Sequence, residues 1–282
     1  MRRLCILSSV FILLSLSTVA QMPESRWATL DGSKIHYYDT GNAKAKDAIV
    51  LIHGWSCNAD FWKDTYNAFP TYRVISIDLL GHGKSDAPYV AYSMDTLARS
   101  VDTVLNQAKV RKAIVVGHSM GSVVARKFYS LFPAKTLAIV IVDMPIQPMG
   151  PEEEMKKFAD SVTSNYPQSA EGFVDGMIAS IGKREMKAFI RRTMLSTPKH
   201  SAVSSLSETF EDANWTATKI DVPLLAITAP SDHWKPSKED YEKIAPKVEF
   251  QLWSGVSHFL HMERPAWFNG QVKGWIIRNS LL

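Results

Sequence analysis

A serine stands between two glycines at the point where a strand pattern gives way to a helix pattern. The apolar, β-branched residues 113–116 predict a buried strand, and residues 122–131 follow a helical pattern. Between them lies Gly117-His118-Ser119-Met120-Gly121. In so sharp a turn, a side chain at either glycine would collide with the strand or the helix. The pattern therefore predicts a strained and exposed Ser119 at the N-terminus of a helix, where the helix dipole favours negative charge.

The rest of the chain alternates between strand and helix patterns. Strands are predicted at residues 48–52, 72–77, 137–142, 223–228 and 248–253, and the continuous apolar run at residues 48–52 is typical of a strand buried on both faces. Helical spacing of apolar residues predicts helices at residues 94–107, 238–244 and 264–277. Two more strands are predicted at residues 27–30 and 34–38, with a turn between them. Such alternation predicts a mostly parallel sheet flanked by helices.

One segment interrupts this alternation. Residues 144–197 contain no convincing strand, and their patterns predict helices near residues 152–164, 170–181 and 184–195. We expect a helical lid at the end of the sheet that carries Ser119, inserted into a core domain of residues 21–143 and 198–282. The segment holds six methionines: Met144, Met149, Met155, Met177, Met186 and Met194. Methionine can line an apolar pocket, but ordinary helix packing is the expectation for most of these side chains.

Further motifs follow the ends of the predicted strands. His53-Gly54-Trp55 comes after residues 48–52, and Asp-Leu-Leu-Gly-His-Gly-Lys-Ser at residues 78–85 comes after residues 72–77. Asp232 follows the strand at residues 223–228, and His258 ends a Gly-Val-Ser-His sequence before the last helix. With the turn at Ser119, these motifs span nearly the whole chain beyond residue 26.

This series of motifs closely resembles the α/β-hydrolase superfamily. It is most similar to the branch with carboxylesterases, cofactor-free haloperoxidases or perhydrolases, and carbon–carbon bond hydrolases. The segment His53-Gly54-Trp55 followed by Asp60-Phe61-Trp62 is particularly similar to perhydrolase and aryl-esterase members. The resemblance implies an α/β-hydrolase fold with a mostly parallel eight-stranded sheet, flanked by helices, and a helical lid inserted after the sixth strand.

The resemblance also implies a catalytic triad. Ser119 is a weak nucleophile unless a base lies within hydrogen-bond reach. His258 is the expected base, because serine, acid and histidine follow in this order along the chains of this fold. Asp232 is the favoured acid, on a loop long enough to turn toward His258 and hold its tautomer. Asp143, at the end of the strand at residues 137–142, stays open as the alternative, since some relatives place the acid there.

The expected reaction is cleavage of a small- or medium-acyl carboxylic ester through an acyl-enzyme, without a cofactor. The backbone N–H groups of Trp55 and Met120 are expected to bind the oxyanion that forms when a carbonyl is attacked. A carbon–carbon bond hydrolase or a perhydrolase with the same triad is the alternative. A ligand-binding protein on a retained hydrolase scaffold is less favoured, because such a protein would not need all three triad residues.

Composition narrows the range of partners. A hydrophobic content of 46% and a charged content of 21% are ordinary for a globular enzyme. The sequence has no basic run of the kind that binds nucleic acid, and no histidine spacing that predicts a metal site. We therefore expect a small-molecule substrate, and neither a nucleic acid nor a metal.

The first twenty residues resemble a secretory signal. Arg2 and Arg3 form a positive start, residues 4–16 are apolar and uncharged, and small residues lead up to Ala20. The apolar run is short for a membrane span, although an uncleaved anchor is the alternative. We expect a secreted or periplasmic protein with no stable membrane association after cleavage.

Cleavage after Ala20 should leave an exported chain that begins at Gln21. The intact mass of the exported protein checks this prediction. A mass that retains residues 1–20 would indicate an anchor.

Overall fold

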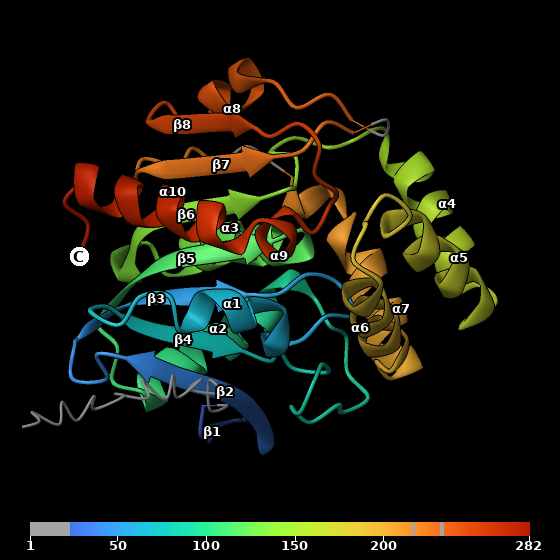
Figure 1. Cartoon of the computed structure of the whole chain (residues 1–282). Helices are drawn as coiled ribbons and strands as arrows, with labels where there is room; N and C mark the ends of the chain where they lie inside the picture. Colours follow the sequence, from blue (N-terminus) through green and yellow to red (C-terminus); the bar gives the residue numbers. More distant parts are fainter. Residues whose placement is uncertain (1–22, 216–217, 232–233) are drawn as a thin grey trace, which may run out of the picture.

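The computed structural model describes residues 23–215, 218–231 and 234–282, so the predicted signal segment lies outside the described residues (Figure 1). Within these residues, eight strands form one sheet in the order β1-β2-β4-β3-β5-β6-β7-β8. The pairs β1–β2 and β2–β4 are antiparallel, and the other neighbours are parallel. The strands are β1 (Ser25–Leu30), β2 (Ser33–Gly41), β3 (Asp47–Ile52), β4 (Arg73–Ile77), β5 (Lys112–His118), β6 (Thr136–Val142), β7 (Leu224–Thr228) and β8 (Val248–Leu252). The predicted mostly parallel sheet is confirmed.

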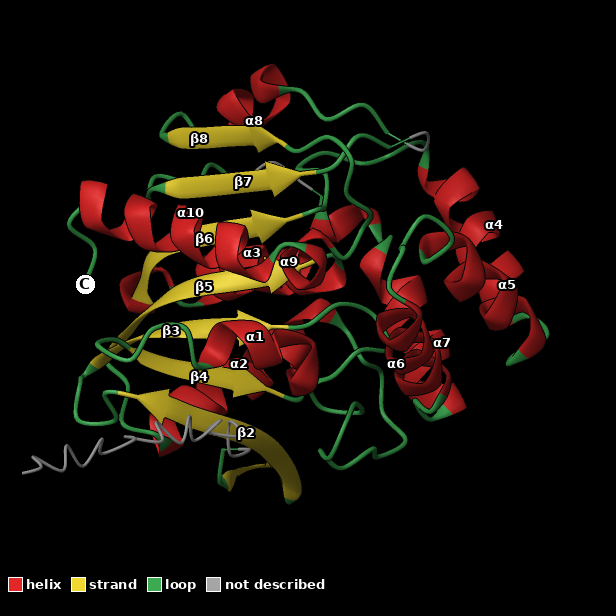
Figure 2. Ribbon diagram, viewed as in Figure 1, coloured by secondary structure: helices red, strands yellow, loops and turns green. Residues whose placement is uncertain are grey.

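Helices cover both faces of this sheet (Figure 2). One face carries α1 (Lys63–Tyr66) and α10 (Pro265–Arg278), with α9 (Leu260–Glu263) directly before α10. The other face carries α2 (Met94–Gln107), α3 (Met120–Leu131) and α8 (Lys238–Ile244). Short 3-10 helices lie at Ala59–Trp62, Pro133–Lys135 and Asp212–Asn214. None of the described helices is both long and apolar enough to cross a membrane.

The strand β3 shows why its sequence is continuously apolar. Its residues alternate between the two faces of the sheet. Ile49 and Leu51 pack in the cluster that includes α10, whereas Val50 and Ile52 pack in the cluster that includes α2 and α3. All four are almost completely buried. Because both faces are covered, no position from Ala48 to Ile52 is left for a polar side chain.

Four helices follow β6, the sixth strand, and lie beyond the carboxyl ends of the strands (Figure 1). They are α4 (Glu152–Thr163), α5 (Gln168–Met177), α6 (Arg184–Leu195) and α7 (Lys199–Thr209). We call residues 152–209 the cap segment. The first three helices match the helical patterns in the sequence closely.

The fourth helix, α7, extends the helical segment beyond residue 197, where the sequence analysis ended it. Its sequence is rich in serine and has a weak apolar pattern. Ser201 and Ser205 are nevertheless fully buried. The Ser205 hydroxyl donates to the Ser201 carbonyl, and the Thr209 hydroxyl donates to the Ser205 carbonyl, each at 2.7 Å. These bonds to the preceding turn let small polar residues occupy a buried helix face, which periodicity of apolar residues does not detect.

Ser119 alone makes the turn between β5 and α3. Its φ of +52° lies in a region that residues other than glycine rarely adopt. A Cβ atom on Gly117 would overlap the carbonyl oxygen of Gly121. A Cβ atom on Gly121 would lie 2.5 Å from the carbonyl oxygens of Ile52 and His53. These contacts confirm that both flanking positions require glycine.

The substitution Gly121→Ala should therefore destabilise the fold by about 3 kcal/mol, because backbone atoms must move to admit the methyl group. Gly270→Ala is the matched control, since Gly270 is exposed in α10 and a Cβ atom there meets nothing within 4 Å. That change should stabilise the helix by about 0.5–1 kcal/mol. Urea unfolding of both variants checks the pair. Equal effects of the two substitutions would contradict the packing at the turn.

Candidate active site

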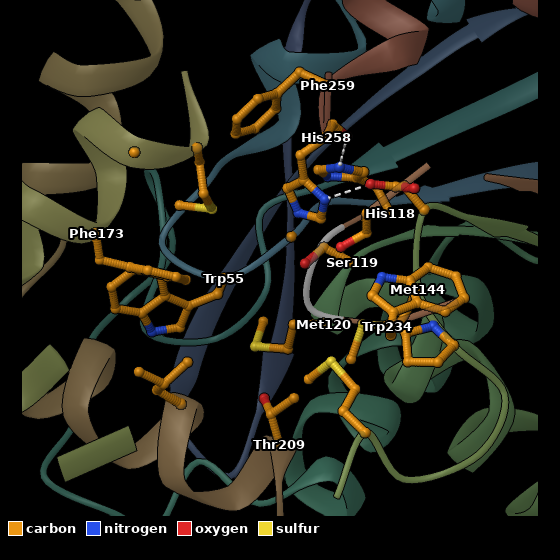
Figure 3. A pocket seen from close by; sticks show the side chains of 18 of the residues that line it. Trp55, His118, Ser119, Met120, Met144, Phe173, Thr209, Trp234, His258 and Phe259 are labelled. Atoms are coloured by element: carbon orange, nitrogen blue, oxygen red, sulfur yellow. Dashed lines mark hydrogen bonds and ion pairs between the residues drawn. The ribbon is translucent and has the colours of Figure 1, made fainter. Parts of the chain in front are cut away.

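Ser119 opens into a cavity of about 570 Å³ between the sheet and the cap segment. The side chains of Ser119 and His258 both line this cavity and lie close together in Figure 3. Ser119 sits at the carboxyl end of β5, and His258 lies in the loop between β8 and α9. The structure thus brings the predicted nucleophile and the predicted base to one place, although they are far apart in the sequence.

Asp143 holds the ring of His258. The Nδ1 atom of His258 lies 2.7 Å from Oδ2 of Asp143. Asp143 follows β6 directly, has a φ of +48° and is only 6% exposed. Its other oxygen, Oδ1, accepts a hydrogen bond of 2.7 Å from the backbone N–H of Ala229. With Nδ1–H donated to this carboxylate, the neutral imidazole keeps Nε2 free to accept a proton.

This contact reverses the preference that the sequence analysis gave to Asp232. Asp232 and its neighbour His233 lie outside the described residues. The place beside His258 Nδ1, where Asp232 was expected, is filled by Asp143. Asp143, which the sequence analysis left open as the alternative acid, binds the backbone N–H of Ala229 with one oxygen and His258 with the other. The positive φ, which the sequence does not reveal, is the conformation in which the other oxygen reaches His258.

The predicted oxyanion donors lie beside Ser119. Trp55 belongs to the loop after β3, and Met120 is the first residue of α3, where backbone N–H groups have no partner within the helix. The loop approaches closely, because a Cβ atom on Gly54 would lie 3.2 Å from Cβ of Ser119. Both residues line the cavity. No described residue accepts a hydrogen bond from the backbone N–H of Trp55.

Two hydrogen bonds connect this oxyanion loop to the cap segment. The indole Nε1–H of Trp55 donates to the carbonyl of Ala202 in α7 at 2.8 Å. The hydroxyl of Thr197, between α6 and α7, donates to the carbonyl of Ser56 at 3.1 Å. The sequence analysis missed both, because the partners are more than a hundred residues apart and neither bond has a local signal.

The buried histidines around the site are neutral. Burial lowers the pKa of His118 well below its ordinary value and that of His261 to about 3. A neutral His118 can donate from Nε2 to the carbonyl of His258, and these atoms lie 2.8 Å apart (Figure 3). His118 thus holds the loop of His258 without placing a positive charge beside the ring.

His36 lies in β2, within the strand predicted at residues 34–38, and is fully buried. Its Nδ1 is 2.8 Å from Asp78, and its Nε2 is 2.9 Å from the hydroxyl of Ser25. This serine–histidine–aspartate set repeats the order of contacts in a triad. None of its three residues lines the cavity. Asp78 also accepts from the backbone N–H groups of Ala59 and Lys84, so this set fixes the β1–β2 hairpin to the loop after β4.

Apolar side chains dominate the remaining lining of the cavity. Trp55 and Phe173 stand on one side, and Met144 and Trp234 stand on the other (Figure 3). Of the six methionines in the predicted lid, all but Met186 line the cavity. Met144 and Met194 are buried in the core and the other four pack against it, as expected for ordinary helix packing, so five of these methionines both pack and line the cavity.

Chemistry based on other groups finds little support in the described residues. Cys57 lines the cavity, but burial raises the pKa of its thiol well above the ordinary value, so the thiol stays protonated and unreactive. Among the residues that the structure describes, no three histidine, cysteine or acidic side chains are grouped so as to hold a metal ion.

The sheet order, the serine turn between β5 and α3, and the histidine–aspartate pair beside it define an α/β-hydrolase. The sequence model of the alpha/beta hydrolase fold matches residues 47–260, and the chain belongs to this family and is a hydrolase. It is 26% identical to the non-heme chloroperoxidase CPO-A1 of Kitasatospora aureofaciens, over 83% of this chain and 92% of that protein. It is 28% identical to the 2-hydroxy-6-oxononadienedioate/2-hydroxy-6-oxononatrienedioate hydrolase of Paraburkholderia phymatum, over 84% of this chain and 88% of that protein. Among solved structures it resembles the esterase RhEst1 from Rhodococcus sp., with 25% identity, a TM-score of 0.74, and coverage of 92% and 99% of the two chains.

The contact between His258 and Asp143 predicts an NMR signal that requires no substrate. The Nδ1 proton of His258 should be protected from exchange and resonate far downfield, because it is held by a buried carboxylate. Asp143→Asn should abolish this signal, and Asp232→Asn should leave it in place. A signal that survives the first substitution and disappears with the second would return the acid to Asp232.

Proposed function

We propose that the protein hydrolyses carboxylic esters through an acyl-enzyme on Ser119, with His258 as base and Asp143 as the acid that orients it. The observation that carries this proposal is the hydrogen bond that Nδ1 of His258 donates to Asp143, beside a serine held in a strained turn. Nucleophile, base and orienting acid in this arrangement are the signature of an activated serine.

The reaction then proceeds in two halves. The Ser119 hydroxyl attacks the ester carbonyl, and its proton passes to Nε2 of His258. The backbone N–H groups of Trp55 and Met120 stabilise the oxyanion. His258 returns the proton to the departing alcohol, which leaves an acyl group on Ser119. Water attacks this acyl-enzyme, again losing a proton to His258, and the carboxylic acid is released as the serine recovers its proton.

The charge of the cavity favours esters over the carbon–carbon cleavage named for the Paraburkholderia relative. The name of that relative's substrate denotes two carboxylates. In the described part of the chain, no lysine or arginine lines the cavity, and its one acidic side chain is Asp143. A substrate with two buried carboxylates would have no cationic partner here, and unpaired buried charges are costly.

We also propose that this hydrolysis takes place outside the cytoplasm. The signal-like residues 1–20 support this location, and they lie outside the described residues. A single cysteine beyond that segment, Cys57, means that the core folds without an internal disulfide in an oxidising compartment.

The substitution Ser119→Ala should reduce turnover of p-nitrophenyl butyrate by about ten-thousandfold, because the nucleophile is lost while the oxyanion donors remain. Asp143→Asn should lower turnover by a similar factor at most, and Asp232→Asn should lower it far less. Ser25→Ala is the matched control, since Ser25 also contacts a histidine that is paired with an aspartate. That variant should keep full activity.

A serine-directed fluorophosphonate, followed by peptide mass analysis, identifies the nucleophile independently of the ester chosen. It should label the peptide that contains Ser119 in the native protein and in the Ser25→Ala variant. Activity that persists in a well-folded Ser119→Ala variant, or label found on another serine, would overturn the assignment.

A further inference from the structure

Six thioether side chains converge on the cavity beside Ser119. Met120 is the first residue of α3, directly after Ser119, and the other five come from the segment between β6 and β7. We call the six the methionine sleeve: Met120, Met144, Met149, Met155, Met177 and Met194. Thioethers are apolar, flexible and polarisable, so they adapt to an aliphatic chain better than branched side chains do. The aromatic part of the lining is more rigid, because Phe173 packs against Trp55 and edge-on against Phe158.

We propose that the sleeve selects uncharged esters whose acyl part is a flexible aliphatic chain of about eight to twelve carbons. This inference rests on the proposed function, because it assigns a substrate class to the same nucleophile. It excludes two other classes, acetyl-sized esters and esters whose acyl chain ends in a carboxylate.

The size of the cavity supports the chain length. A volume of about 570 Å³ holds on the order of twenty water-sized groups at about 30 Å³ each. A methylene group is similar in size to a water molecule. An acetyl ester of a small alcohol would fill less than half of this space and leave the sleeve uncovered. A medium-length acyl chain and its alcohol together fill it.

The charges around the cavity support the exclusion of anions. Asp143, the acidic side chain in the lining, already binds His258 and the backbone of Ala229. The hydroxyl of Thr209 donates within α7 and is not free to bind a substrate. Arg126 is buried in α3 but is not part of the lining, and its guanidinium lies over the ring of Trp215. Among the described residues that line the cavity, no lysine or arginine is available to a carboxylate in the sleeve, which would therefore lose its hydration without gaining a cationic partner.

The first experiment compares p-nitrophenyl esters of graded length with one charged analogue. The value of kcat/KM should rise by at least about tenfold from acetate to octanoate, because each buried methylene can contribute up to about fourfold. Mono-p-nitrophenyl suberate has the same eight-carbon acyl chain with a carboxylate at its far end. Its kcat/KM should be at least about a hundredfold below that of the octanoate.

The second experiment places a cation in the sleeve. Met177→Lys, a partly exposed position in α5, should raise the suberate-to-octanoate ratio of kcat/KM by at least about tenfold. Met155→Lys in α4 repeats the test if the first variant does not fold. Met186→Lys is the matched control, because Met186 is a partly exposed methionine of the same segment that does not line the cavity. It should leave both rates unchanged.

The outcomes separate the two proposals. Three results would overturn the substrate class and leave the esterase proposal standing. They are a preference for acetate over octanoate, equal rates for octanoate and suberate, and an equal change of the suberate-to-octanoate ratio in the sleeve-lysine variants and the Met186 control. Absence of hydrolysis for every ester, with Ser119 unlabelled by the fluorophosphonate, would overturn the esterase proposal itself.

Discussion

The parallel pairing from β3 through β8 is the constraint on which the candidate site depends. Carboxyl ends of parallel strands meet at one edge of a sheet, so each of these loops delivers a different group to the same place. Trp55 comes after β3, Ser119 after β5, Asp143 after β6 and His258 after β8. The register is equally strict, because Ser119 and Asp143 are the first residues beyond the paired His118 and Val142. A slip of one residue would turn the side chains of a strand to the opposite face.

The same pairing holds two residues in costly conformations. Ser119 and Asp143 both have a positive φ, which costs roughly 1–2 kcal/mol for a residue with a side chain. The N–H of Ser119 donates to the carbonyl of Val142, and the N–H of Asp143 donates to that of Ile227. Each strained residue is thus bonded to the next strand of the sheet. Strain of this kind persists only where the surroundings fix it, and it gathers at functional sites.

The fold and most of the candidate site could be predicted because their signals are local. Apolar runs, helical spacing and the glycines around Ser119 each occupy a few consecutive residues. The partner of His258 could not be predicted in this way. The choice between Asp143 and Asp232 depends on a backbone angle and on a contact across 115 residues of sequence, and neither leaves a local trace.

Which methionines line the cavity could not be predicted for a related reason. A methionine at helical spacing has the same pattern whether it faces a packed core or an open pocket. Met186 and Met177 look alike in the sequence, yet only Met177 lines the cavity. Likewise, the strand that holds His36 was predicted correctly, while the burial of His36 against Asp78 depends on a loop more than forty residues away.

The cap segment contributes both to substrate fit and to the position of an oxyanion donor. Its methionines form half of the sleeve, and its α7 helix also bonds the indole of Trp55, whose backbone N–H is one of the two proposed oxyanion donors. Thr197 adds a second bond, to the carbonyl of Ser56 in the same loop. Any shift of the cap that widens the sleeve must therefore either move the oxyanion loop or break these bonds. Substrate fit and oxyanion geometry are thus coupled through one element, which offers a physical route by which a poorly fitting acyl chain would lower kcat as well as raise KM.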